Sequence, residues 1–184
     1  MITEPKEYLL KNGMKVVVKT PEIEDAYNIV NHIMAVARST HFLLSEPEDF
    51  QKYLDDIDLE KEKLRQYRDG KDYMFAVYLD GIVIANSNLN FFSHLKDQHR
   101  ARVGIGIQKE YWNLGIGTIL FNEMIETARN TPGIEQVELE VISINERAKH
   151  LYNKMGFRKV GTLPHQLKLP DGTYYDEDIM VLFL

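Results

Sequence analysis

Two kinds of apolar pattern alternate along this chain and predict its secondary structure. Short runs rich in Val, Ile, Phe and Tyr, bounded by turn residues, are typical of strands. Longer segments with apolar side chains every three or four positions are typical of helices that bury one face. We therefore expect strands over residues 14–19, 73–79, 82–92, 100–108, 137–141, 157–162 and 174–184. We expect helices over residues 20–37, 58–68, 116–129 and 145–155.

Polar and turn residues mark where several of these elements begin and end. Thr20 is a suitable N-cap for the first helix. Asp80-Gly81 between two apolar runs is a strong hairpin signal. Residues 39–50 show no periodicity and contain Pro47, so we expect irregular structure there. Residues 58–68 are charged with few apolar anchors, which favours a helix that forms a surface lid.

The resulting order of elements is β-α-α-β-β-β-α-β-α-β-β. This order predicts an α/β fold in which a mixed sheet is covered by helices on both faces. The chain has 184 residues, of which 44% are hydrophobic and 27% charged, as in ordinary globular proteins. This length is ample for one core. We therefore expect a single domain over residues 1–184.

Composition and charge exclude several classes of protein. Cysteine is absent, so there is neither a disulfide framework nor a thiol nucleophile, and we expect a cytoplasmic protein. The net charge of −6 argues against a broad nucleic-acid-binding surface and is compatible with an amine substrate. No apolar run is long enough to span a bilayer, and the first residues lack the pattern of a signal peptide. We expect neither nucleic acid nor membrane as a partner.

The most informative stretch is residues 110–121, Glu-Tyr-Trp-Asn-Leu-Gly-Ile-Gly-Thr-Ile-Leu-Phe, between a predicted strand and a predicted helix. Gly115 and Gly117 allow backbone N–H groups to approach a ligand without interference from Cβ atoms. The helix N-terminus adds free donors and partial positive charge, which suits a phosphate or pyrophosphate. A P-loop and a dinucleotide fingerprint are excluded, because the required lysine and third glycine are missing. An ordinary glycine turn into a core helix remains the alternative.

The loop resembles the acetyl-CoA loop of the Gcn5-related N-acetyltransferases (GNAT), whose pattern is Arg/Gln-x-x-Gly-x-Gly/Ala, except that Trp112 occupies the first position. Residues 145–157 resemble the second signature of this family, Asn-x-x-Ala-x-x-Leu-Tyr-x-x-x-Gly-Phe. The order of elements also resembles that of the family, and the loop is most similar to the branch related to ribosomal-protein acetyltransferases. The resemblance implies the acyl-CoA N-acyltransferase fold, with a central, mostly antiparallel sheet flanked by helices on both faces. The implied cofactor is acetyl-CoA.

The resemblance also assigns residues to coenzyme binding. The backbone of the loop would bind the pyrophosphate, and the strand before it would line a slot for the thioester arm. The implied cofactor-binding residues are Ile105, Gly106, Ile107, Asn113, Leu114, Gly115, Ile116, Gly117, Thr118, Asn145 and Tyr152. The strand and helix assignments also have structural alternatives. The strand glycines could serve only close packing, and Asn145 could serve only as an N-cap.

Acetyl transfer to an amine needs a base, a donor to the carbonyl oxygen and an acid for the departing thiolate. The resemblance assigns the donor to the backbone N–H of Ile107. Tyr152 is the predicted acid, because a phenol with a pKa of about 10 stays protonated at neutral pH; a core tyrosine is the alternative. Glu140 is the predicted base, since ribosomal-protein N-terminal acetyltransferases carry a catalytic glutamate there. A solvent-facing glutamate, or a base made of ordered water and backbone carbonyls, remains open.

We therefore expect an N-acetyltransferase, an acyltransferase that passes acetyl directly from the thioester to a primary amine in a ternary complex. The amine would belong to a small molecule or a protein N-terminus, selected by residues 39–68, the region of His94 and residues 161–175. The alternative is a non-catalytic acyl-CoA-binding sensor or regulatory module. The histidines show no metal-ligand spacing, so no metal is expected. Dimerisation is common in this family, which makes a homodimer a further expectation.

Overall fold

The computed structural model of the chain describes residues 1–184, which divide into two compact units. The first unit contains residues 1–90 and 104–120, and the second contains residues 91–103 and 121–184. Eight strands are hydrogen-bonded in the order β1-β2-β3-β4-β5-β6-β8-β7, and β5 contributes residues to both units. This mixed, mostly antiparallel sheet with its helices confirms the predicted fold class. None of the helices is both long and apolar enough to cross a bilayer.

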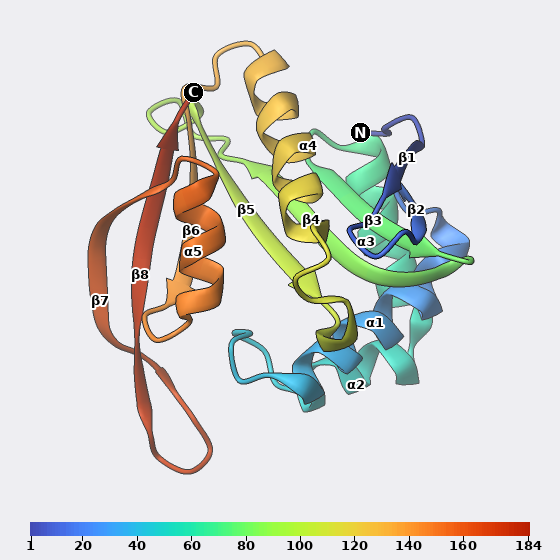
Figure 1. Cartoon of the computed structure of the whole chain (residues 1–184), viewed down its shortest axis with the longest axis horizontal. Helices are drawn as coiled ribbons and strands as arrows, with labels where there is room; N and C mark the ends of the chain where they lie inside the picture. The colour runs from blue at the N-terminus through green and yellow to red at the C-terminus, as the bar shows by residue number, and fades with distance from the viewer. The chain divides into compact units, whose positions relative to one another are not determined.

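The first unit combines an antiparallel meander with three helices. Its strands are β1 (Lys6–Leu9), β2 (Lys15–Lys19), β3 (Tyr73–Leu79) and β4 (Ile82–Phe91). Its helices are α1 (Ala26–Ser39), α2 (Pro47–Asp55) and α3 (Ile57–Asp69), with a 3-10 turn at Ile23–Asp25 before α1. α1 contacts both α2 and α3 (Figure 1). The predicted Asp80-Gly81 hairpin joins β3 to β4, with Leu79 opposite Ile82.

The core of this unit joins its helices to its strands. The buried members are Ala26, Ile29, Leu64, Met74, Ala76, Tyr78 and Val83. Leu64 of α3 is only 1% exposed, and Tyr67 packs against the same cluster. The prediction that this charged helix is a surface lid is therefore wrong. Two apolar residues three positions apart lie on one helix face and are enough to anchor it.

The β1–β2 hairpin is an element that the hydrophobic pattern does not predict. Its strands pair from Lys6↔Val18 to Leu9↔Lys15, and Gly13 adopts a φ of 86° in the turn. β1 is largely exposed, so it has no apolar alternation to identify it. The signal that could have found it is Asn12-Gly13, a dipeptide typical of tight hairpin turns.

Two predicted features near the first helices are also wrong. Residues 39–50 are not wholly irregular, because Pro47 begins α2. Proline is favourable at the first helical position, and Glu46 and Asp49 form a reciprocal capping box there. Thr20 does not cap α1, since its hydroxyl accepts a hydrogen bond from Thr3 N at 3.0 Å instead.

The second unit is built on a parallel pair of strands and a long hairpin. The first residues of β5 (Arg100–Ile107) pair with β6 (Gln136–Ile142), from Arg100↔Gln136 to Arg102↔Glu138. β8 (Tyr174–Phe183) pairs antiparallel with both β6 and β7 (Arg158–Lys168). β7 and β8 form a long hairpin beside α5 (Glu146–Lys154), as Figure 1 shows. The strand predicted over residues 157–162 thus extends to Lys168.

Helix α4 (Ile116–Asn130) begins in the first unit and continues into the second. Aromatic side chains close the core of the second unit. Phe121 of α4 lies edge-on to Phe157, with ring centroids 5.6 Å apart, and both side chains are 1% exposed. Leu139 of β6 and Met180 of β8, which are paired in register, are buried as well. Val137, Leu139 and Val141 of the strand predicted over residues 137–141 are therefore part of the buried core.

Candidate functional site

The glycine loop between β5 and α4 adopts a backbone that presents N–H groups. Asn113 has a φ of 63° and Gly115 a φ of 98°, both in the left-handed region. The first helical hydrogen bond of α4 runs from Ile119 N to Gly115 O, at 3.1 Å. The N–H groups of residues 116–118 therefore precede the helical ladder and are free to donate to a ligand. Successive donors at a positive helix end suit a phosphate group.

Two contacts fix this loop to its own unit. The indole N–H of Trp112 donates to Ile107 O at 2.8 Å, which ties the loop to the last residue of β5. Lys11 N, from the β1–β2 turn, donates to Leu114 O at 3.2 Å. Because both contacts are main-chain or indole bonds, the loop is held in position without a charged side chain of its own.

The glycines of β5 make room for asparagine side chains of β4. A Cβ on Gly104 would lie 2.7 Å from Oδ1 of Asn88, and a Cβ on Gly106 would lie 3.1 Å from Oδ1 of Asn86. A side chain at either glycine would therefore displace its neighbour. This close approach supports the structural alternative for Gly106, whose predicted role in coenzyme binding stays a prediction, as do those of Ile105 and Ile107.

His32 of α1 is buried and hydrogen-bonded at both ring nitrogens, and the sequence analysis did not identify it as a site residue. Its side chain is joined to Gln108 through Nδ1 at 3.2 Å and to Asn86 through Nε2 at 3.0 Å. The Gln108 amide also donates to Val83 O at 3.1 Å, which fixes its orientation and makes Nδ1 the acceptor. Burial lowers the pKa of His32 to about 4, against hydrogen bonds to Asn86 and Gly106 that act to raise it. The imidazole is therefore neutral at physiological pH.

Tyr152 and Asn145 lie on α5 in the second unit. The Tyr152 ring packs 5.2 Å from Phe121 and is 8% exposed at the residue level. Burial raises the pKa of its hydroxyl to about 12, although the nearby Arg147 cation acts to lower it. Asn145 caps the helix, since its side chain accepts from Ala148 N at 3.2 Å. The predicted capping role of Asn145 is confirmed, and the role of Tyr152 as the acid stays a prediction.

Glu140 belongs to an ion-pair cluster on β5 and β6. Arg102 Nη2 lies 3.2 Å from a Glu140 oxygen and 2.9 Å from a Glu138 oxygen. Arg100 also binds Glu138, which is almost fully buried. Glu138 and Glu140 lie on one face of β6 and share Arg102 as a partner. Glu140 is the one exposed residue of β6, as the solvent-facing alternative expects, and its role as base stays a prediction.

Glu177 of β8 is a further carboxyl group on this face, which the sequence did not single out. It pairs with Ile142, two residues beyond Glu140 on β6. Burial and the charge of Glu140 raise the pKa of Glu177, while Arg102 acts to lower it. No group of three or more His, Cys, Asp or Glu side chains in the chain is arranged to hold a metal ion.

Comparison with known sequences supplies the context for these residues. The sequence profile described as the acetyltransferase (GNAT) family matches residues 33–157, more than half of the chain. The chain belongs to the GNAT family. The matched range contains the glycine loop, Glu140, Asn145 and Tyr152.

Individual GNAT relatives match part of the chain in sequence and most of it in fold. The L-amino acid N-acetyltransferase AaaT of Escherichia coli (strain K12) is 31% identical over 98 residues, which cover 53% of this chain and 60% of AaaT. The chain therefore spans less than two thirds of that relative. A GNAT acetyltransferase from Streptococcus pneumoniae has a TM-score of 0.83 at 23% identity, covering 92% of this chain and 99% of that one. The microcin C7 self immunity acetyltransferase MccE, solved with acetyl-CoA and AMP, has a TM-score of 0.74 at 15% identity, with 92% of each chain covered.

Trp112 is where this GNAT chain departs from the family loop pattern that the sequence resembles. An Arg or Gln at this position would offer polar hydrogen-bond donors. Here the only tryptophan of the chain takes that place, and its N–H is directed to Ile107 O. The substitution thus replaces a polar side chain of the loop with an anchor to β5.

Proposed function

We propose that this protein is an acetyl-CoA-dependent N-acetyltransferase that moves an acetyl group directly to a primary amine. The observation that carries the proposal is the loop of a GNAT chain in which Asn113 and Gly115 adopt left-handed backbone and residues 116–118 offer free N–H groups. Gly115 also leaves space for a ligand, since a Cβ there would meet only Lys11 within 4 Å. These features fit a pyrophosphate.

Acetyl-CoA supplies an activated thioester when bound. In the proposal, N–H groups of Asn113 to Thr118 bind its pyrophosphate and the N–H of Ile107 donates to the thioester carbonyl. Tyr152, which is protonated at neutral pH, donates its hydroxyl proton to the leaving sulfur. Glu140 accepts the proton of the amine, directly or through water. Asn145 contacts the pantetheine arm in addition to capping α5.

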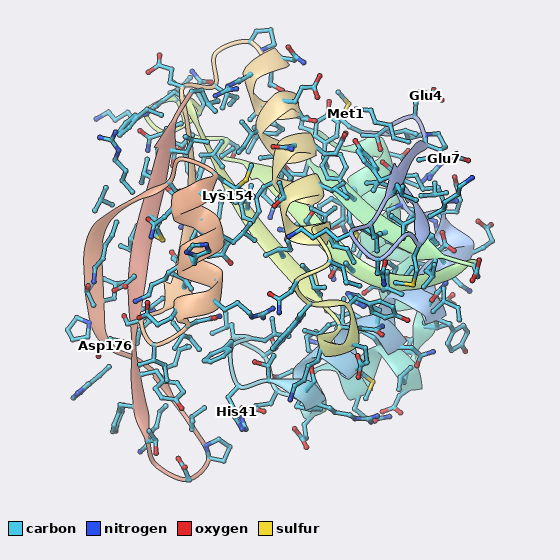
Figure 2. The ribbon with its side chains drawn as sticks, viewed as in Figure 1. Met1, Glu4, Glu7, His41, Lys154 and Asp176 are labelled. Atoms are coloured by element: carbon cyan, nitrogen blue, oxygen red, sulfur yellow. The ribbon has the colours of Figure 1, made fainter.

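The proposed acceptor is a primary amine on a small molecule or a protein N-terminus. The name of the relative AaaT, an L-amino acid N-acetyltransferase, supports amino acids as the first candidates to test. The loop after α1 carries the outward-pointing His41 (Figure 2), and the β7–β8 hairpin carries Asp176. We propose that these two segments contribute to acceptor selection. We also propose that the chain acts as one acetyltransferase domain and assembles as a homodimer.

A thiol-release assay tests the activity. The protein is mixed with acetyl-CoA and a panel of amines (amino acids, polyamines and short peptides), and free coenzyme thiol is measured. Amine-dependent thiol release supports the proposal. Acetyl-CoA binding without release for any amine would instead identify a non-catalytic binding module, and absence of binding would overturn the proposal altogether.

Gly115→Glu tests the location of the site. The substitution adds a side chain and a negative charge where the pyrophosphate is proposed to bind, and we expect coenzyme binding and turnover to be abolished. Gly133→Glu is the matched control, because Gly133 also has a left-handed φ, of 85°, but lies in the turn after α4 with no atom within 4 Å of its Cβ position. Undiminished coenzyme binding by Gly115→Glu would place the site elsewhere.

A further inference from the structure

The turn between β1 and β2 brings a lysine to the glycine loop. Leu10 N donates to Met14 O at 2.8 Å and Gly13 N donates to Leu10 O at 2.9 Å, which closes the turn. Leu10 is only 3% exposed and anchors it. Lys11 is exposed at the tip. The turn therefore holds the backbone of Lys11 while its side chain remains accessible.

Lys11 contacts the loop through both backbone and side chain. Its N–H donates to Leu114 O at 3.2 Å. A Cβ on Gly115 would lie 3.9 Å from Cγ of Lys11 and 4.0 Å from its Cε. The aliphatic stem of the lysine thus runs along the glycine whose left-handed backbone shapes the loop.

The loop has no cation of its own. Residues 112–118 read Trp-Asn-Leu-Gly-Ile-Gly-Thr, without Lys or Arg. The side chain of Trp112, at the position of the Arg or Gln in the family pattern, donates to Ile107 O. The ammonium group of Lys11 forms no hydrogen bond or ion pair in the structure. An unpaired cation therefore borders a loop of free N–H donors.

We propose that Lys11 binds the pyrophosphate of coenzyme A and supplies the positive charge that the loop lacks. The inference rests on the proposed function, because it assigns a further residue to the same site. A lysine ammonium is a mobile point charge that pairs well with phosphate oxygens. Because the side chain is exposed, water and salt screen this contact, and we expect a moderate effect on affinity.

The test measures coenzyme A binding to Lys11→Met by titration calorimetry. Methionine keeps an unbranched side chain and the Lys11 N–H bond to Leu114 O but removes the charge. We expect the dissociation constant to rise about twofold to fivefold, as for an exposed charged contact. The increase should shrink as salt is added. Lys11→Arg should retain most of the affinity.

Lys15→Met is the matched control, because Lys15 is an exposed lysine of the same hairpin, paired in register with Leu9. We expect wild-type affinity from it. Dephospho-coenzyme A, which keeps the pyrophosphate and lacks the 3′-phosphate, distinguishes the two phosphate sites. The loss caused by Lys11→Met should be the same with both coenzymes.

Two outcomes would overturn the inference. One is equal affinity of wild type and Lys11→Met, and the other is a loss that disappears with dephospho-coenzyme A, which would assign Lys11 to the 3′-phosphate. If wild-type protein binds neither coenzyme, the proposed function itself fails. Failure of the inference and failure of the function are therefore separate results.

Discussion

His32 is buried and neutral, and it is hydrogen-bonded to Asn86 of β4 and to Gln108, which follows β5. This arrangement makes the stability of the fold depend on pH. In the unfolded chain the imidazole binds a proton below about pH 6.5, whereas in the folded chain its pKa is about 4. Above pH 6.5 the imidazole is neutral in both states and does not change the unfolding free energy. As the pH falls from 6.5 toward 4, only the unfolded chain gains a proton there, so the unfolding free energy decreases.

We expect acidification from pH 7 to pH 4 to cost about 3 kcal/mol of unfolding free energy through this residue, at about 1.4 kcal/mol per pH unit. Urea unfolding at several pH values measures the effect. The comparison is His32→Gln, which cannot titrate and should show a shallower dependence in this range. Identical pH profiles for the two proteins would show that His32 is not the group responsible.

Tyr152 combines a packing role with its proposed chemical one. Tyr152→Phe keeps the ring against Phe121 and Phe157 and removes only the hydroxyl. We expect kcat to fall about a hundredfold or more, since a positioned acid typically contributes about 10²–10⁴-fold. Coenzyme affinity should stay nearly unchanged. Steady-state kinetics with calorimetry decide the point, and unaltered turnover would leave Tyr152 as a core tyrosine only.

At the scale of elements, Asp178 of β8 links α5 to the β7–β8 hairpin. Its carboxylate accepts from Ser143 Oγ at 2.7 Å, Thr162 Oγ1 at 2.9 Å and Lys159 Nζ at 2.7 Å, and it is 1% exposed. Burial acts to raise the pKa of Asp178, but the bonds from Lys159, Ser143 and Thr162 outweigh it and lower the pKa. Helix α5, which contains Tyr152 and is capped by Asn145, is thus held in position through Ser143 in the connection between β6 and α5.

We expect Asp178→Asn to lower the unfolding free energy by about 3 kcal/mol, because it leaves buried donors and a lysine without their anion. Chemical denaturation measures the loss. Glu146→Gln is the control. Like Asp178, Glu146 pairs with a lysine: it lies 2.7 Å from Lys149, but its side chain is 81% exposed. The unfolding free energy of Glu146→Gln should therefore differ from wild type by less than about 0.5 kcal/mol. Equal effects of the two substitutions would contradict the proposed role of Asp178.

The elements that the sequence failed to predict are those whose signals are local rather than periodic. β1 has three exposed residues, so only Asn12-Gly13 could have indicated it. α2 begins at Pro47, which suggests a break in structure unless the capping residues Glu46 and Asp49 are recognised. The position of α3 was predicted correctly, but its packing against the core was not. Its few apolar residues are buried by residues far away in the chain, which the local sequence does not indicate.

At the scale of the whole molecule, acetyl-CoA should stabilise the native chain. A ligand present at a hundred times its dissociation constant adds about 2.7 kcal/mol to the unfolding free energy. For a chain of this size, this corresponds to a rise in Tm of about 5–10 °C. Thermal unfolding followed by circular dichroism measures it. Gly115→Glu should show no shift, and an unchanged Tm for wild type at saturation would contradict coenzyme binding to the native state.

The fluorescence of Trp112 offers a second measurement of coenzyme binding. It is the only tryptophan of the chain and lies on the glycine loop, where its indole is fixed to Ile107 O. Tryptophan emission therefore reports on this loop alone. We expect it to change on addition of coenzyme A and to remain unchanged in Gly115→Glu.

The sequence by itself determined the α/β class, most of the strands and helices, and the two signatures of the GNAT family. These features depend on local periodicity, on glycine at a loop that needs left-handed backbone, and on residues close together in the chain. Only the tertiary structure decided that His32 is neutral, that Asn86 and Asn88 lie where side chains on Gly104 and Gly106 would be, and that Lys11 borders Gly115. Each of these depends on burial or contact between distant residues, and the local pattern of a chain does not record its distant neighbours.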